Sequence, residues 1–283
     1  TLTTRAVAGD QGQVQVNYDG FAHLVRPGAR LLLDDGLIEL KAVAVGATDV
    51  ECRVVVGGIL SDRKRVSIPG GKLDLPALSG DDERDLLFGV EHGVDLVAAS
   101  FIRNAGDVDV IKSFLAHHGA DIPVIAKVEN GEGIDNLDSI LQASDGLMVA
   151  RGDLGVELPA EDVPIIQKQM IHECRRAGKP AITATQMLDS MMRVPSPTRA
   201  EVSDVANAVF DGTDALMLSG ETASGRYPVE SVATMARVAL KAEIARHCDP
   251  PQELKPSTPG TSVTDAIGHA TVQVADDLGA SAI

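Results

Sequence analysis

A lysine and a carboxylate stand two residues apart in the segment PVIAKVEN, residues 123–130. Successive side chains of a strand point to opposite faces, so Lys127 and Glu129 are expected on the same face. Asp153 follows another apolar run, in the string VARGD. Glu129 and Asp153 supply oxygen ligands that suit Mg²⁺ or Mn²⁺, and Lys127 adds a positive charge that can stabilise a transferring phosphoryl group. The combination favours metal-assisted phosphoryl transfer, or enolisation of a carboxylated substrate.

Each feature also has a plainer explanation. Lys127 and Glu129 could neutralise each other at the exit of a strand, and RGD at residues 151–153 is a common tripeptide. Thr183 and Thr185 are strand-forming residues that need no function to lie in a strand. The recurrence of polar residues after successive apolar runs is harder to attribute to chance, and it indicates one shared site.

Five apolar runs alternate with helix-like segments, a pattern that predicts βα units and a parallel sheet. In such sheets ligands bind at the carboxyl ends of the strands. The residues at the five expected strand ends are Ser100; Lys127 and Glu129; Arg151, Gly152 and Asp153; Thr183 and Thr185; and Ser219 and Glu221.

Two of the helix-like segments carry clear end signals. Asp162 is the expected N-cap of one helix and Gly178 its end. Thr198 and Glu201 have the spacing of a capping box at the start of a second helix, which Gly212 is expected to end. These signals mark the expected ends of two helices in the βα region.

Composition limits the classes of partner. The chain has 283 residues with 25 Lys and Arg against 41 Asp and Glu, a formal net charge of −16, which argues against nucleic-acid binding and against an anionic membrane surface. Its three cysteines lie far apart without a CxxC motif, which favours a reducing compartment. No apolar run approaches the roughly 18 residues of a membrane span, and no signal peptide is visible. A cytoplasmic location follows as the default expectation.

The sequence pattern divides the chain into three parts. Residues 1–71 contain short β-rich runs separated by turn signals such as PGA and DDG, and they are expected to form a small all-β domain. Residues 72–247 contain the βα units. Residues 248–283 begin with the Pro-rich string CDPPQELKPSTPGTS, which is typical of a linker.

Several strings, in order and with the same spacing, resemble the pyruvate kinase family. They include LLLDDGLIEL, AKVENGEGIDNLDSILQASDGLMVARGDLGVELPAEDVPIIQK, CRRAGKPAITATQMLDSM and PSPTRAEVSDVANAVFDGTDALMLSGETASGRYPVE. The resemblance implies phosphoryl transfer from phosphoenolpyruvate to ADP, giving pyruvate and ATP in the last step of glycolysis, with Mg²⁺ or Mn²⁺ and often K⁺. It also implies a homo-oligomer, in this family usually a tetramer.

The family's site residues can be carried over where the motifs match. The resemblance makes Lys127 the lysine that stabilises the phosphoryl group, and Glu129 and Asp153 the metal ligands. The backbone around Gly152 and Asp153, with Thr185, corresponds to the pocket for the substrate carboxylate, and Thr185 lies near the point at which the enolate is protonated. Ser219 and Glu221 correspond to a supporting polar cluster.

The expected all-β domain also contains residues that resemble those of the family. Lys64 in SDRKRVSIPGG falls where the family has a nucleotide-contacting lysine, with Arg63 and Arg65 as possible helpers, although a solvated basic loop explains the cluster nearly as well. The string DDG at residues 34–36 resembles the tip of the family's lid, whose closure would exclude water.

The resemblance implies a partial (β/α)8 TIM barrel of about five βα units, with a small all-β lid domain and the start of an α/β C-terminal domain. The family's first three barrel strands have no counterpart here, nor have its substrate-binding arginine and its K⁺ ligands. Two alternatives to an active phosphotransferase therefore stay open: a catalytically silent truncated fragment that acts as a binding or interaction module, and a metal-dependent lyase or aldolase of the phosphoenolpyruvate/pyruvate type.

Overall fold

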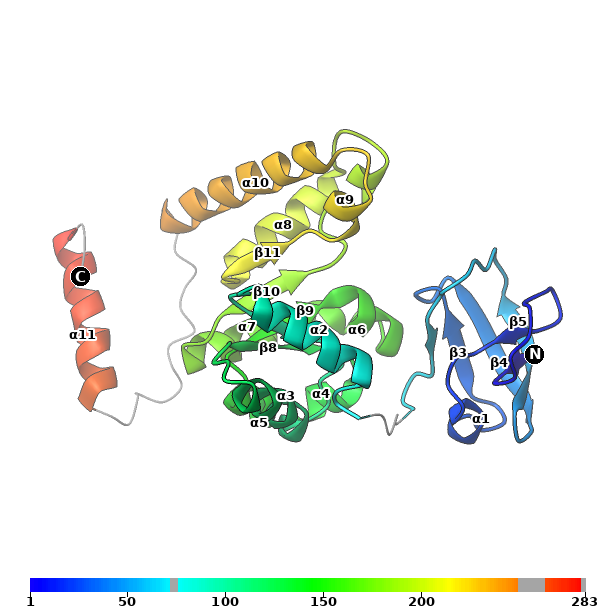
Figure 1. Ribbon diagram of the computed structural model, residues 1–283. Helices are drawn as coiled ribbons and strands as arrows, with labels where there is room; N and C mark the ends of the chain where they lie inside the picture. The colour runs from blue at the N-terminus through cyan, green and yellow to red at the C-terminus, as the bar shows by residue number, and fades with distance from the viewer. Residues whose placement is uncertain (72–75, 249–262, 281–283) are drawn as a thin grey trace.

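The computed structural model describes residues 1–71, 76–248 and 263–280 of the chain. Their strands form two sheets, which lie apart in Figure 1, the first in blue near the N-terminus and the second at the centre of the molecule. The first sheet uses strands between residues 2 and 67, and the second uses strands between residues 97 and 217. Residues far apart in the sequence therefore meet mainly within each sheet.

The first sheet has the strand order β2-β1-β5-β4-β3-β6 in the described part of the chain. Its longest strands are paired in antiparallel fashion, with Leu33 opposite Ile38 at the β3–β4 connection. Leu31, Leu33, Leu40 and Val50 lie in its core. The strands are β1 (Leu2–Thr3), β2 (Val14–Gln15), β3 (Arg30–Leu33), β4 (Ile38–Val45), β5 (Asp49–Val56) and β6 (Val66–Ser67).

The β3–β4 connection contains the DDG string. Asp34, Asp35 and Gly36 have φ angles of 52°, 54° and 87°, and Leu37 N–H donates to the Asp34 carbonyl at 3.0 Å. Positive φ at both central residues is the conformation of the tight hairpin turns that suit twisted strands, and Asp and Gly tolerate it best. The turn predicted from the sequence is therefore present.

The N-terminal part is not purely β. One helical turn, α1 (Phe21–Leu24), interrupts the strands, and it buries Phe21 and Ala22. A four-residue turn is too short to show helical periodicity in the sequence, and its stability comes from these two side chains entering the core of the sheet.

The second sheet is parallel throughout, with the order β11-β10-β9-β8-β7. Its strands are β7 (Val97–Ala99), β8 (Val124–Val128), β9 (Gly146–Ala150), β10 (Ala181–Ala184) and β11 (Ala215–Met217). Each lies inside one of the five apolar runs, so the prediction of five consecutive βα units is confirmed. Within the described residues β7 and β11 are the two edges of this sheet.

Helices alternate with these strands. Figure 1 shows α10 lying along α8 near edge strand β11, and α3 and α5 side by side near β8. The helices are α2 (Gly80–Glu91), α3 (Ala105–His117), α4 (Gly131–Asp135), α5 (Leu137–Ala143), α6 (Arg151–Glu157), α7 (Val163–Ala177), α8 (Arg199–Asp211), α9 (Gly220–Ala223), α10 (Pro228–Cys248) and α11 (Val263–Leu278), with a 3₁₀ turn η1 (Asp189–Met192).

Most of the expected helix ends are confirmed. Gly178 and Gly212 end α7 and α8 with φ of 65° and 96°, a conformation that glycine adopts without strain. Thr198 and Glu201 form a reciprocal capping box. Asp162 occupies the expected N-cap position of α7, although its backbone is already helical and its side chain accepts no capping hydrogen bond.

Alternation along the parallel strands separates two environments. Val124, Ala126 and Val128 of β8 belong to the large core that α3, α5 and α7 cover. Ile125 lies on the other face, in a small cluster with Met148 of β9 and Ala184 of β10. Lys127 follows Ile125 by two residues and so emerges on that same inner face.

The C-terminal part adds little to the site. The start of the expected α/β C-terminal domain is present as α11, whereas residues 249–262 of the expected linker lie outside the described residues. Among the residues described, none of the helices combines the length and apolarity that crossing a bilayer requires.

Candidate active site

The end of β8 presents the lysine and the carboxylate to each other. Lys127 Nζ lies 2.8 Å from Glu129 Oε1 and donates to Ser100 Oγ, at the end of β7, at 2.7 Å. Only 22% of the Lys127 side chain and 1% of the Glu129 side chain is exposed. The predicted sharing of one face is correct, and the two charges form a largely buried ion pair.

Glu129 sits in an environment that disfavours its negative charge. Burial raises the pKa of its carboxyl group, and the negative charge of Asp153 acts in the same direction, whereas Lys127 and the Phe101 N–H oppose the rise. The Phe101 N–H donates to Glu129 Oε2 at 3.0 Å. A cation near Glu129 and Asp153 would offset both unfavourable effects.

Asp153 lies in the first turn of α6, directly after β9. Its carboxylate forms an ion pair with Arg65, which precedes β6 of the first sheet. Burial raises the pKa of nearby Glu157 as well, and the charge of Arg65 counteracts this rise. Three carboxylates and two basic side chains thus gather at this end of the parallel sheet.

Gly152 and Thr185 meet across the ends of β9 and β10. The Gly152 N–H donates to Thr185 Oγ1 at 2.7 Å, and this hydroxyl donates to the Ala184 carbonyl at 2.7 Å. A Cβ atom on residue 152 would lie only 3.3 Å from Thr185 Oγ1. Glycine therefore lets the hydroxyl approach the backbone closely.

Unusual backbone conformations occur at two of the strand ends. Thr185 and Gln186 have φ of 70° and 54°, and Phe101 has φ of 57°. β-branched and bulky residues rarely adopt positive φ, and such strain persists only where the surrounding contacts enforce it. Strain of this kind concentrates at functional sites, which agrees with the placement of the site at these strand ends.

Arg151 is the side chain that holds the strained segment after β10. Its Nη2 donates to the Thr185 carbonyl at 2.8 Å, and its Nη1 pairs with Asp204 of α8 at 2.7 Å. The Arg151 side chain is only 11% exposed and lies behind the site, between α6, α7 and α8. Arg151 therefore positions Thr185.

Glu221 likewise fixes the position of the segment after β11, the last strand of the sheet. Its carboxylate accepts the Leu188 N–H at 3.1 Å and the Ser219 N–H at 2.9 Å, so it joins the segments after β10 and β11. Ser219 Oγ is buried without a hydrogen-bond partner among the described residues. Glu221 therefore joins the two loops through its side chain, whereas Ser219 takes part through its backbone N–H.

Two of the residues singled out from the sequence lie outside this group. Thr183 is fully buried and bonds through Oγ1 to Thr213 Oγ1 at 2.9 Å, because alternation places it on the face of β10 opposite to Ala184. Lys64 Nζ pairs with Asp34 Oδ1 at 2.7 Å within the first sheet, and that contact raises the pKa of the lysine.

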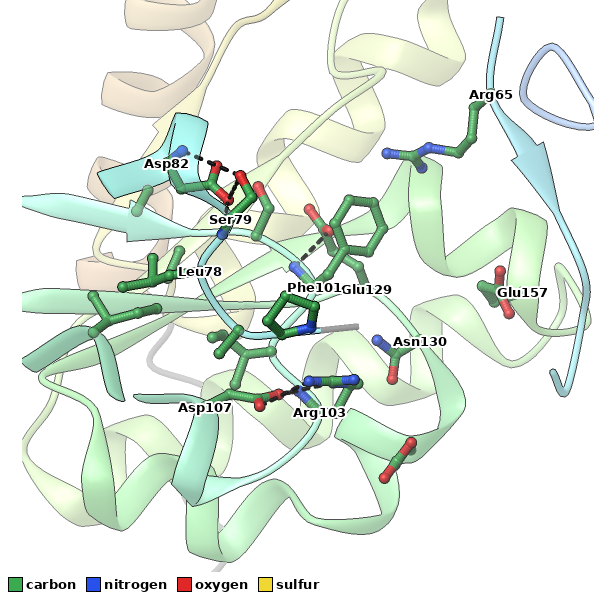
Figure 2. A pocket seen from close by; sticks show the side chains of 18 of the residues that line it. Arg65, Leu78, Ser79, Asp82, Phe101, Arg103, Asp107, Glu129, Asn130 and Glu157 are labelled. Atoms are coloured by element: carbon green, nitrogen blue, oxygen red, sulfur yellow. Dashed lines mark hydrogen bonds and ion pairs between the residues drawn. The ribbon is translucent and has the colours of Figure 1, made fainter. Parts of the chain in front are cut away.

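A cavity of about 1030 Å³ opens beside the site along edge strand β7. Figure 2 shows Glu129 next to Phe101 at its wall, with Arg65 reaching in from the first sheet and Glu157 nearby. Ser100 and Arg65 also line the cavity. The site is thus accessible from a space large enough for a small-molecule ligand.

Sequence reasoning missed the part that Phe101 plays and the true position of Arg65. Phe101 is apolar, and its contribution is a backbone N–H, which no side-chain pattern reveals. Arg65 was grouped with Lys64 as a nucleotide-loop residue, although its guanidinium meets Asp153, 88 residues away in sequence. The basic cluster in SDRKRVS was the one signal that could have indicated it.

The donor chemistry fits a divalent ion held partly by the protein. In the described residues no group of three or more His, Cys, Asp or Glu side chains is placed to hold a metal. Two neighbouring carboxylates, of which Glu129 is buried, suit Mg²⁺ or Mn²⁺, which keep several waters and take other ligands from substrate.

The parallel sheet, its covering helices and the charged cluster at the carboxyl ends of its strands define a β/α-barrel protein. A family model described as the pyruvate kinase barrel domain matches residues 1–232. The chain belongs to the pyruvate kinase family, and the predicted partial (β/α)8 barrel is confirmed.

Similar proteins carry consistent names. The chain is 50% identical over 280 residues to a pyruvate kinase of Bacillus licheniformis, covering 98% of this chain and 48% of that protein. It is 52% identical over 287 residues to the enzyme of Geobacillus stearothermophilus, covering 100% and 49%. It is 47% identical over 278 residues to a pyruvate kinase of Clostridium acetobutylicum, covering 98% of this chain and 59% of that protein. The chain thus spans about half the length of the curated relatives it matches, and these names do not favour the lyase or aldolase alternative.

Proposed function

We propose that the intact protein transfers the phosphoryl group of phosphoenolpyruvate to ADP, giving pyruvate and ATP. The observation that carries the proposal is the Lys127–Glu129 pair, 2.8 Å apart and largely buried at the carboxyl end of β8, in a chain of this family. A lysine in this position offers a fixed positive charge where negative charge develops on a transferring phosphoryl group.

Glu129 and Asp153 would hold Mg²⁺ or Mn²⁺. When bound, the ion supplies positive charge that binds and polarises phosphoryl and carboxylate oxygens of the substrates. Glu129 is prepared for this task because the Phe101 N–H fixes one carboxylate oxygen. Lys127, held by Ser100, stays beside the carboxylate and contacts the phosphoryl group.

Gly152, Asp153 and Thr185 would form the pocket for the substrate carboxylate. Gly152 leaves its N–H open to a close approach, and that N–H now meets Thr185 Oγ1. A substrate carboxylate binding here would take over the N–H, and the Thr185 hydroxyl would have to turn away from the Ala184 carbonyl to become a second donor. We place Thr185 near the carbon that receives a proton when the enolate becomes pyruvate.

The remaining parts of the assignment follow from the family. Lys64 would contact the nucleotide after release from Asp34, and the turn at residues 34–36 would move with it as the tip of a lid formed by residues 1–71. K⁺ is a possible further cofactor, whose ligands have no counterpart in this chain. A cytoplasmic homo-oligomer, a tetramer by family resemblance, completes the proposal.

The test is ADP-dependent formation of pyruvate from phosphoenolpyruvate, with and without Mg²⁺. It is run on the 283-residue chain and, in parallel, on the intact protein at the length of its relatives. We expect activity in the intact protein that requires both ADP and Mg²⁺ and that Glu129→Gln abolishes. Pyruvate release without ADP would contradict phosphoryl transfer and favour a lyase, and an inactive intact protein would favour a binding module.

A further inference from the structure

Arg65 connects the first sheet to the carboxyl end of the second. Its guanidinium pairs with Asp153 in α6, and its Cζ lies 4.6 Å from the centre of the Phe101 ring, which follows β7. Figure 2 shows the side chain extending from the first sheet toward Glu129 and Phe101. A guanidinium over an aromatic ring at this distance is attracted electrostatically by the ring face.

The backbone of Arg65 is part of the first sheet. The Arg65 carbonyl accepts the Asp34 N–H at 3.2 Å, and the next residue, Val66, pairs with Leu33 of β3. The side chain therefore links the first sheet to Asp153 and Phe101 beside the second sheet. Its departure changes the contact between the two sheets.

The guanidinium also lies where a cation is needed. Asp153 is one of the two carboxylates assigned above to the divalent ion, and Arg65 supplies the positive charge that this carboxylate lacks. A divalent ion bound to Asp153 repels an adjacent guanidinium, because two positive charges in a partly buried site are poorly screened. The ion and Arg65 therefore compete for the same carboxylate.

We propose that Arg65 is a built-in counter-ion of the cation site, and that a divalent ion binding at Asp153 displaces it and loosens the first sheet from the end of the second. This inference rests on the proposed function, since it assumes that Asp153 binds the ion. It assigns to Arg65 a role that differs from nucleotide contact. When a divalent ion is bound at Asp153, residues 1–71 can then move relative to the second sheet.

The first experiment measures Mn²⁺ binding to the intact protein without substrates, by electron paramagnetic resonance of the free ion. Arg65→Gln should bind Mn²⁺ about tenfold more tightly than the unsubstituted protein, because one charge-assisted contact no longer has to be broken. Arg53→Gln is the matched control, since Arg53 is exposed on β5 and carries the same charge change away from the site. It should leave the affinity within about twofold, as exposed surface charges are largely screened.

Asp153→Asn distinguishes the assignment of the cation site from the counter-ion role of Arg65. If it weakens Mn²⁺ binding while Arg65→Gln leaves affinity unchanged or lowers it, the site assignment stands and the counter-ion role is overturned. If Asp153→Asn binds Mn²⁺ like the unsubstituted protein, the assignment of the cation site fails and the inference fails with it.

A second experiment follows the guanidinium directly. The 283-residue chain contains no tryptophan, so Phe101→Trp introduces a reporter under Arg65, read as the difference from the unsubstituted protein. We expect a saturable change in tryptophan emission as Mg²⁺ is added, and no such change in the double variant Phe101→Trp with Arg65→Gln. An equal change in the double variant would show that Arg65 does not leave the ring.

Discussion

At the scale of single residues, the site depends on burial. Lys127 and Glu129 neutralise each other, as the plainer explanation of their spacing held, and the same pairing keeps both charges in place at a buried strand end. A buried carboxylate that loses its partner is strongly disfavoured, so the pair cannot be altered on one side without consequence. The structural and functional explanations are therefore compatible.

Replacing Lys127 by Met should lower the turnover of pyruvate formation at least about 10²-fold, because a fixed positive charge at the transferring group is lost. Mn²⁺ binding should persist, since Glu129 then lacks its only contacting lysine in the described structure and favours another cation. Steady-state kinetics and Mn²⁺ titration measure the two effects.

Lys112→Met is the control for Lys127→Met. Lys112 pairs with Asp145 before β9, at the opposite end of the sheet from the strand ends that form the site. Its replacement should leave turnover unchanged. Unchanged turnover in Lys127→Met itself would remove this lysine from the mechanism.

At the scale of elements, α8 is fixed to the neighbouring loop by one carboxylate. Glu201 accepts hydrogen bonds from the backbone N–H and hydroxyl of both Ser190 and Thr198, at 2.6–2.9 Å. Burial alone raises the pKa of Glu201, but these hydrogen bonds outweigh it and lower the pKa below its usual value. The capping box of α8 thus also anchors η1, which follows the Thr185 segment.

Glu201→Gln should destabilise the protein by about 2 kcal/mol at pH 7, because a neutral amide cannot accept all four charge-assisted bonds. A lowered folded-state pKa means that this stabilisation is present above the unfolded pKa and is lost as pH falls through the folded pKa. The difference in the free energy of unfolding between the unsubstituted protein and Glu201→Gln should therefore narrow as the pH falls below about 4.5. Urea unfolding at several pH values measures it.

Glu161→Gln provides the comparison for Glu201→Gln. Glu161 is an exposed residue just before α7, and its replacement should change the free energy of unfolding by less than about 0.5 kcal/mol. If the loss of unfolding free energy in Glu201→Gln stayed constant from pH 7 to pH 3, ionisation of Glu201 would not be what stabilises the loop.

At the scale of the whole molecule, the two sheets have separate cores. Leu31 lies in the core of the first sheet and Leu147 in the core of the second, and both are fully buried. Contacts between the two parts include the ion pair of Arg65 with Asp153 and its stacking on Phe101. We therefore propose that residues 1–71 and 72–247 are distinct domains.

Leu31→Ala should lower the stability of the first sheet by about 2–5 kcal/mol through loss of buried area and a residual cavity. Hydrogen exchange should accelerate in β3, β4 and β5 while β8, β9 and β10 keep their protection. Leu147→Ala should give the reverse pattern. Equal loss of protection in both sheets for either variant would show one cooperative unit and contradict the proposed boundary.

The sequence by itself determined the parallel sheet, the helix ends and most of the site. Five apolar runs and the glycine and capping-box signals are local patterns, and local patterns are sufficient where a strand is buried on both faces. The polar strand ends that bring Lys127, Glu129, Asp153 and Thr185 together followed from the rule that parallel strands share one carboxyl edge.

Only the tertiary structure decided which polar residues face the site. Alternation places Thr183 on the face of β10 opposite to Ala184 and away from the site, whereas Thr185 reaches the site because the chain leaves the strand geometry there, where φ is 70°. The Phe101 N–H and the Arg65 guanidinium reach Glu129 and Asp153 across 28 and 88 residues of sequence. Such contacts depend on how separate elements pack, and no local period or motif encodes that distance in space.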